Sequence, residues 1–138
     1  MNKQKGFTII ELIVVIAIIA VLAAIVLVNV TQYISRGKDA SIKGNMSSMV
    51  TIAAAYYDNN SSSYTDLSTE STFAAGLVAI DNANGTAKAQ KAEVISSAFC
   101  IVAELNDGTL WCVDSTGYKG APAAYTDCDA GTADCAVD

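Results

Sequence analysis

The fold is decided by residues 7–28, which read FTIIELIVVIAIIAVLAAIVLV. As an α-helix this stretch would be about 33 Å long, close to the hydrocarbon thickness of a bilayer. No polar side chain follows residue 11 within it, and Glu11 is the only charged residue between Lys5 and Arg36. A carboxylate in hydrocarbon is costly unless it has a partner or lies near the interface. Glu11 therefore points to a function.

The basic residues in front of this stretch predict its orientation in a membrane. Lys3 and Lys5 directly precede it, so the positive-inside tendency places the N-terminus in the cytoplasm and residues after 28 outside. A cleaved secretory signal should be shorter and end in an A-x-A-like site, which is absent here. An ordinary single-span anchor leaves Glu11 unexplained. So long an apolar run also disfavours a buried helix of a soluble protein.

Helical periodicity continues beyond the apolar block to about residue 57. One stripe recurs at steps of three to four residues: Val30, Ile34, Gly37, Ser41 or Ile42, Met46, Met49, Ala53, and Tyr56 or Tyr57. The polar stretch from Asn59 to Ser63 then ends the pattern and predicts an exposed loop. We therefore expect a helix over about 7–57, apolar in its first half and amphipathic in its second half, which packs on a small head domain.

The remaining residues predict a small α+β head. A short helix is expected over Ser68–Asn82, with Ser68 or Thr69 as its N-cap. The clearest strands are separated by the turn signal Asn106-Asp107-Gly108, and a third strand is expected before them: Ala98–Leu105, Thr109–Ser115 and Lys91–Ile95. An isolated hairpin is marginal in water, so the amphipathic half of the long helix should cover one face of this antiparallel sheet.

Composition excludes several classes of function. The formal net charge is −6, and without residues 1–6 it is −8, from six basic against fourteen acidic residues. Such a surface repels nucleic acid, so no direct nucleic-acid binding is expected. The absence of histidine weighs against most zinc sites and against His-based catalysis. With no nucleophile–base set and no phosphate loop, we predict that the chain is not an enzyme.

The stretch Lys5-Gly6-Phe7-Thr8-Ile9-Ile10-Glu11, followed by the apolar block, resembles the class III signal of type IV pilins and pseudopilins. The resemblance implies that a prepilin peptidase cuts between Gly6 and Phe7 and methylates Phe7. It divides the chain into a leader over 1–6, a transmembrane and filament-core helix over 7–28, and an extracytoplasmic head over 29–138. Val28 stands where many family members carry a helix-disrupting proline, which predicts a continuous helix there.

The resemblance also gives Glu11 a role in assembly, as the fifth residue after the cut. Cleavage creates a new amine on Phe7 at a helix start, where the helix dipole is already positive. Glu11 lies one turn further on and can pair with this amine or with that of a neighbouring subunit. A charge buried alone is strongly penalised, so pairing favours one axial register. Phe7 and Glu11 are therefore the predicted subunit-assembly residues.

Four cysteines, at 100, 112, 128 and 135, allow three connectivities. An extracytoplasmic location favours disulfides, and the missing Cys-x₂-Cys spacing disfavours zinc. We predict Cys100–Cys112, because these residues lie on adjacent strands of one hairpin. We predict Cys128–Cys135 because it closes a short C-terminal loop like the cysteine-closed loop of many pilins.

Aspartates gather around the last two cysteines. Asp127, Asp129 and Asp134 are candidate calcium ligands, since calcium takes several oxygen ligands and some secretion pseudopilins bind it near the C-terminus. Their spacing matches no EF-hand loop, and a solvated acidic loop is the favoured interpretation. No cofactor or metal is otherwise expected.

These features together predict a structural subunit of a type IV pilus or pilus-like filament. Expected partners are copies of the chain itself, the prepilin peptidase, the pilus assembly platform and minor pilins. The subunit should lie in the cytoplasmic membrane before assembly and in an extracellular pilus afterwards. The alternative is a major pseudopilin of a type II secretion system. A third interpretation is an enzyme or binding domain that uses the helix only as a membrane tether.

Overall fold

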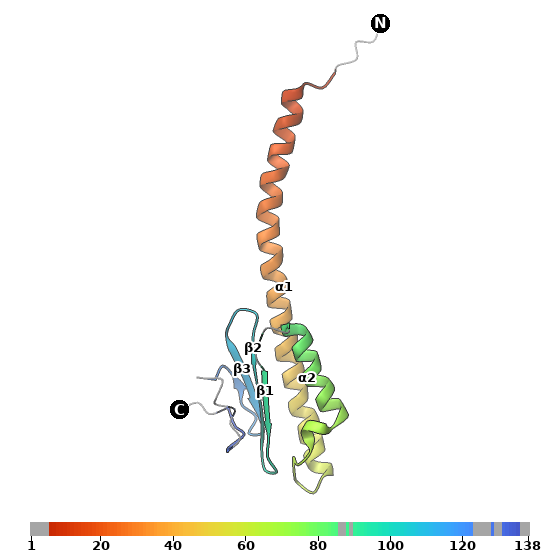
Figure 1. The fold of residues 1–138 in the computed structure, drawn as a ribbon, viewed down its shortest axis with the longest axis vertical. Helices are drawn as coiled ribbons and strands as arrows, with labels where there is room; N and C mark the ends of the chain where they lie inside the picture. The colour runs from red at the N-terminus through yellow and green to blue at the C-terminus, as the bar shows by residue number, and fades with distance from the viewer. Residues whose placement is uncertain (1–5, 86–87, 89, 123–127, 129–130, 136–138) are drawn as a thin grey trace. The chain divides into compact units, whose positions relative to one another are not determined.

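The computed structural model describes residues 6–85, 88, 90–122, 128 and 131–135. The chain forms two compact units, residues 1–34 and 35–138. Figure 1 shows the elements, whose bounds are α1 (Ile9–Asn59), the 3₁₀ turn η1 (Leu67–Thr69), α2 (Ser71–Asn84), β1 (Gln90–Val94), β2 (Phe99–Glu104), β3 (Leu110–Asp114) and β4 (Lys119–Gly120).

Helix α1 confirms the predicted long helix, with both ends two residues later than expected. It passes through Val28 without a break, as the missing proline predicted. It ends where the polar loop begins, and Ser61 and Ser62 both take a left-handed backbone conformation there. The N–H of Ser62 donates to the carbonyl of Tyr57 at 3.1 Å, which satisfies a carbonyl of the last turn.

The second half of α1 buries the predicted stripe. Its buried residues recur at steps of three to four and are Asp39, Ile42, Met46, Met49 and Ala53. The four apolar ones form one core with apolar residues of α2 and of the inner sheet face: Phe73, Ile80, Phe99, Ile101, Ala103 and Val113. Gly76 allows a close approach of α2 to α1, because a Cβ built there would lie 2.8 Å from the Met49 side chain. The helix thus supplies the sheet with the apolar face that it needs.

Helix α2 starts three residues later than predicted, and its cap is a different residue. Glu70 is the N-cap, and its Oε2 accepts the N–H of Phe73 at 2.7 Å. The predicted caps Ser68 and Thr69 instead belong to the η1 turn, whose Leu67 is fully buried. Burial of Leu67 in the core thus fixes the turn ahead of the helix and leaves Glu70 at its start.

This cap predicts an acid-sensitive contribution to stability. The backbone N–H groups of Thr72 and Phe73 lower the pKa of Glu70 below its usual 4.5. A carboxylate with a lowered folded-state pKa stabilises the fold above its unfolded pKa and loses that contribution as pH falls through the folded value. Glu70→Gln should therefore flatten the pH dependence of the free energy of unfolding as pH falls through and below the usual glutamate pKa of 4.5.

Urea unfolding at a series of pH values measures this dependence. Asp81→Asn is the matched control, because Asp81 is an exposed carboxylate of the same helix that accepts no hydrogen bond from the described residues. In the control, the free energy of unfolding should fall at acid pH as it does in the unsubstituted chain; this fall is the acid limb of the curve. An unchanged acid limb in Glu70→Gln would contradict the prediction.

The sheet is a four-stranded antiparallel meander in the order β1-β2-β3-β4. The three predicted strands are present, and β4 was not predicted because it contains only two residues. In the β2–β3 hairpin Cys100 lies opposite Asp114 and Val102 lies opposite Cys112. Because strand residues alternate between faces, all four of these side chains are on the outer face, away from the core of α1 and α2.

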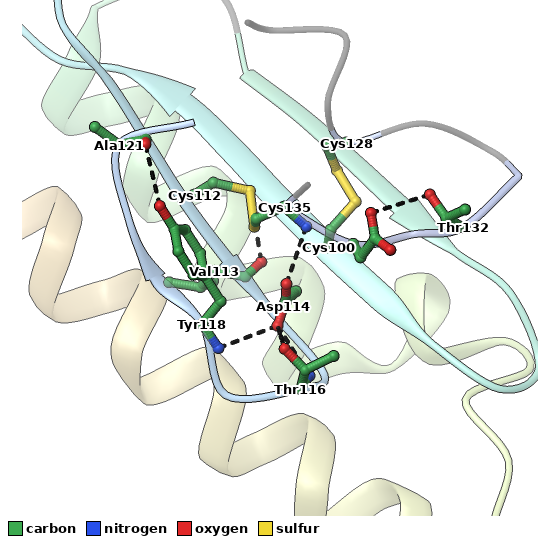
Figure 2. The surroundings of a disulfide bond; sticks show 11 residues. Cys100, Cys112, Val113, Asp114, Thr116, Tyr118, Ala121, Cys128, Thr132 and Cys135 are labelled. Carbon is green, nitrogen blue, oxygen red and sulfur yellow. Dashed lines mark hydrogen bonds between the residues drawn. A yellow bond between two sulfur atoms is a disulfide. The ribbon is translucent and has the colours of Figure 1, made fainter. Parts of the chain in front are cut away.

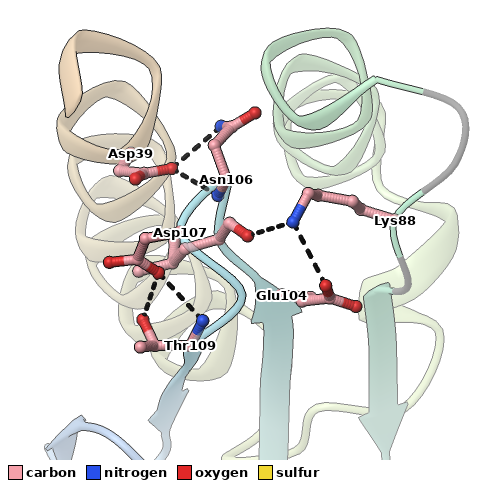
Figure 3. Close-up of polar contacts among 7 residues, drawn as sticks. Asp39, Lys88, Glu104, Asn106, Asp107 and Thr109 are labelled. Atoms are coloured by element: carbon pink, nitrogen blue, oxygen red, sulfur yellow. Dashed lines mark hydrogen bonds and ion pairs between the residues drawn. The ribbon is translucent and has the colours of Figure 1, made fainter. Parts of the chain in front are cut away.

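The tip of the β2–β3 hairpin is tied to α1 by a buried carboxylate. Oδ1 of Asp39, which is 8% exposed, accepts the backbone N–H of Asn106 at 2.6 Å and its Nδ2 at 2.8 Å (Figure 3). On the other side of the tip, Lys88 donates to Glu104 at 3.1 Å and to the carbonyl of Leu105. These contacts fix the predicted Asn106–Gly108 turn relative to the helix.

Two disulfides close the C-terminal region, but the predicted pairing is wrong. The bonds are Cys100–Cys128 and Cys112–Cys135, so each strand cysteine reaches the C-terminal segment (Figure 2). The sheet register explains the error. Cys100 and Cys112 are offset by two residues on one face, while directly opposite positions hold Asp114 and Val102. Diagonal strand neighbours are about 7–8 Å apart, at or beyond the reach of a disulfide.

The described C-terminal residues form a second core on the outer face of the sheet. Its buried members are Cys100, Val102, Cys112, Cys128, Ala133 and Cys135. The buried carboxylate of Asp114 holds this layer: its Oδ2 accepts the N–H of Cys135 at 2.9 Å. Its Oδ1 accepts from the backbone N–H groups of Thr116 and Tyr118 and from the Thr116 hydroxyl (Figure 2). One charged side chain thus fixes both the β3–β4 turn and the end of the described chain.

Candidate processing and assembly site

The predicted cleavage site lies in non-helical backbone directly before α1. Residues 6–8 have no regular structure, and the helix begins at Ile9. The Phe7 side chain is 84% exposed. The Gly6–Phe7 bond therefore precedes the helical hydrogen-bond ladder, so access to its backbone requires no unwinding of α1.

Thr8 and Glu11 form a reciprocal capping box at this helix start. One carboxylate oxygen of Glu11 accepts the backbone N–H of Thr8 at 2.8 Å and the Thr8 hydroxyl at 2.7 Å. In return the Thr8 Oγ1 accepts the backbone N–H of Glu11 at 3.3 Å. Two N–H groups without a helical partner are thereby satisfied. In the uncut chain the carboxylate of Glu11 is held by Thr8.

Sequence reasoning singled out Phe7 and Glu11 but missed the role of Thr8. The signal was present, because Thr-x-x-Glu before an apolar run is the pattern of a capping box. The predicted leader residues 1–5 lie outside the described residues, whereas Gly6 and Phe7 lie within them. The capping box holds Glu11 one turn beyond the predicted cleavage site.

Replacing Thr8 should loosen the first turn of α1. Thr8→Val removes the hydroxyl of the capping box and should cost about 0.5–2 kcal/mol of helix stability at this end. We expect faster amide hydrogen exchange at residues 9–11 of the full chain in detergent micelles. Thr31→Val is the matched control, because the Thr31 hydroxyl bonds the Val28 carbonyl inside the same helix. Equal exchange at residues 9–11 in both variants would contradict this role of Thr8.

The helix after this site presents an apolar surface on all sides. Its large apolar side chains between Ile9 and Val28 are 48–77% exposed within the structure. Helix α1 is long and apolar enough to cross a membrane, judged by length and composition, and it is the one described helix that is. A helix that is apolar all round needs lipid or other apolar surfaces to cover it.

The candidate calcium ligands are only partly within the described residues. Asp127 and Asp129 lie outside them. The carboxylate of Asp134 accepts a hydrogen bond from the Thr132 hydroxyl at 3.1 Å. Across the part of the chain that the structure describes, no group of three His, Cys, Asp or Glu side chains is placed to hold a metal ion.

Comparison with known proteins identifies the N-terminal segment. Residues 1–27 match the family model described as the prokaryotic N-terminal methylation motif. No curated protein and no solved structure matches the chain. The chain thus carries the methylation motif that is typical of type IV pilins and pseudopilins. In this motif, and in the long N-terminal apolar helix packed on an antiparallel sheet with C-terminal disulfides, the chain is similar to type IV pilins.

Proposed function

We propose that this chain is the structural subunit of a type IV pilus and polymerises through α1. One observation carries the proposal: the apolar first half of α1 is exposed on all sides, and its first turn, just after the Gly6–Phe7 bond, holds Glu11 in a capping box with Thr8. Lipid covers such a helix before assembly, and like helices cover it in a filament. Hydrophobic burial is then retained on polymerisation, so assembly requires no exposure of apolar surface to water.

Processing prepares the subunit for this step. A prepilin peptidase cuts the Gly6–Phe7 bond and methylates the amine of Phe7. That amine is the charged group nearest in sequence to Glu11, so the two form the assembly pair within one subunit or between neighbours. The chain is a substrate and a building block, and it catalyses no reaction. It passes from the cytoplasmic membrane to an extracellular fibre.

Sheared fibres from the native host provide the test. The intact mass of the fibre subunit should correspond to residues 7–138 with one added methyl group and two disulfides. Fibres that are long, extracellular and built mainly of this chain support a pilus. Residence of the processed chain only in short periplasmic assemblies that accompany protein secretion would instead favour the major pseudopilin. A fibre subunit that retains residues 1–6 would overturn the processing step.

A further inference from the structure

The two disulfides cross along the chain. The first cysteine pairs with the third over a separation of 28 residues, and the second pairs with the fourth over 23. The sequential pairs, Cys100–Cys112 and Cys128–Cys135, are separated by only 12 and 7 residues. The native bonds are therefore the long-range ones, and the unfolded chain contains a much closer partner for every cysteine.

Loop closure favours the sequential pairs in the unfolded chain. The probability that two residues meet falls roughly as the −3/2 power of their separation. On this scaling the sequential contact Cys100–Cys112 forms about 4-fold more often than the native contact Cys100–Cys128. Likewise, the sequential contact Cys128–Cys135 forms about 6-fold more often than the native contact Cys112–Cys135. Synthesis and export from the N-terminus add to this bias, because Cys100 and Cys112 become available first.

The register of the folded hairpin disfavours the sequential pair Cys100–Cys112. Within the hairpin, Cys100 and Cys112 occupy diagonal positions, and their native partners approach to Cα–Cα distances of 5.7 and 5.9 Å. A Cys100–Cys112 bond would pull the strands out of this register. It would thereby move the turn residue Asn106 away from the buried carboxylate of Asp39, which it contacts at 2.6 Å.

We propose that the head reaches its native form through thiol–disulfide isomerisation, which makes the chain a substrate of a dithiol isomerase. The isomerase converts Cys100–Cys112 and Cys128–Cys135 into the crossed native pairs. The crossed pairing is a property of the two disulfides, whereas the extracytoplasmic location of the enzyme rests on the proposed function. The enzyme acts on Cys100 and Cys112 before the native layer forms, because in the native head both are buried on the outer sheet face under that layer.

The exchange is balanced in electrons and needs no oxidant. The isomerase thiolate attacks Cys100 of the Cys100–Cys112 bond, forms a mixed disulfide and releases the Cys112 thiolate. The Cys112 thiolate attacks Cys135 of the Cys128–Cys135 bond, forms the native Cys112–Cys135 bond and releases the Cys128 thiolate. Cys128 then attacks Cys100 of the mixed disulfide and releases the isomerase thiolate. Two disulfides are present before and after, and the enzyme is regenerated.

Asp114 is the positioning residue for the second native bond. It lies two residues beyond Cys112 on the same face, and its Oδ2 accepts the N–H of Cys135 at 2.9 Å. This bond holds Cys135 beside Cys112 once β3 is in register. Asp114→Asn removes one of the two carboxylate oxygens. It should leave the first-formed pairs unchanged and lower the final share of crossed pairs, whereas Asp81→Asn on α2 should alter neither.

Reoxidation of the reduced full chain in detergent micelles tests the proposal. Samples are alkylated at intervals and mapped without reduction after cleavage with trypsin and an Asp-specific protease, which separates the four cysteines. With glutathione disulfide alone, the sequential pairs should dominate the first samples and persist. Adding purified bacterial disulfide isomerase with reduced glutathione should convert them to the crossed pairs.

The outcomes decide the proposal without requiring every variant to fold. If the three connectivities were used equally, about one third of the first samples would carry the sequential pairs. A sequential share at or below that level would overturn the proposal. So would crossed pairs that form equally fast with and without isomerase. Because no fibre is measured, failure here leaves the pilus proposal untouched, and failure of fibre assembly leaves this one untouched.

Discussion

Replacing Glu11 with glutamine is expected to reduce fibre yield to a small fraction of the unsubstituted level. Glutamine retains an oxygen that can accept the Thr8 N–H bond, which is 2.8 Å long in the structure. It removes the negative charge, so in the proposed filament the amine of Phe7 would lose its counter-ion as the helices pack. An uncompensated charge in an apolar filament core is strongly destabilising.

Shearing and quantification of extracellular fibres measure this loss, and intact mass measures processing. Processed Glu11→Gln subunits that accumulate in the membrane would place the defect in assembly. Thr8→Val is the matched control: it weakens the same capping box but keeps the carboxylate, so its fibres should remain abundant. Normal yield and geometry of Glu11→Gln fibres would rule out charge pairing at this position.

Phe99→Ala should have the largest effect on the stability of the head. The side chain of Phe99 is 1% exposed. Its ring centroid lies 5.1 Å from that of Tyr64 and 6.2 Å from that of Phe73, and both pairs meet edge to face. Truncation leaves a cavity where the sheet meets α2 and the loop after α1. Such substitutions cost about 3–5 kcal/mol of the free energy of unfolding. That is a large part of the roughly 5–15 kcal/mol by which a folded domain is typically stabilised.

Urea unfolding of the full chain in detergent, followed by the fluorescence of Trp111, measures this cost. Val78→Ala is the control, since Val78 is an apolar residue of α2 that is 57% exposed. Its free energy of unfolding should change by no more than about 0.5 kcal/mol. A loss below about 1 kcal/mol for Phe99→Ala would mean that the site relaxes around the missing ring.

Local patterns in the sequence predicted the elements of this fold. The apolar block and the stripe that follows it predicted α1 and its buried face, because both depend only on helical periodicity. The Asn106–Gly108 turn predicted the hairpin because the residues that favour a tight turn are also a local signal. The strand β4 contains two residues, too few for any alternation to show. The Thr8 cap was recognisable from its spacing to Glu11, and it was the one local signal overlooked.

Long-range partners could not be predicted from the sequence. Asp39 on α1 is buried against Asn106, which follows it by 67 residues, and no local pattern pairs them. The disulfides were mispaired because the hairpin and the likeness to a cysteine-closed pilin loop suggested neighbouring partners, while the sheet register selects distant ones. The N-cap of α2 depended on burial of Leu67, a tertiary effect. In each case, packing against another element overrode local preference.

Crossed pairing also has a consequence for the durability of the head outside the cell. With bonds at 100–128 and 112–135, at least one disulfide spans every peptide bond between Cys100 and Cys135. A single proteolytic nick anywhere in this stretch therefore leaves the fragments covalently joined. Sequential pairing would have left residues 113–127 unbridged, and one cut there would sever the C-terminal layer. The surface of a fibre exposed to proteases would thus keep its outer sheet face covered after a first cut.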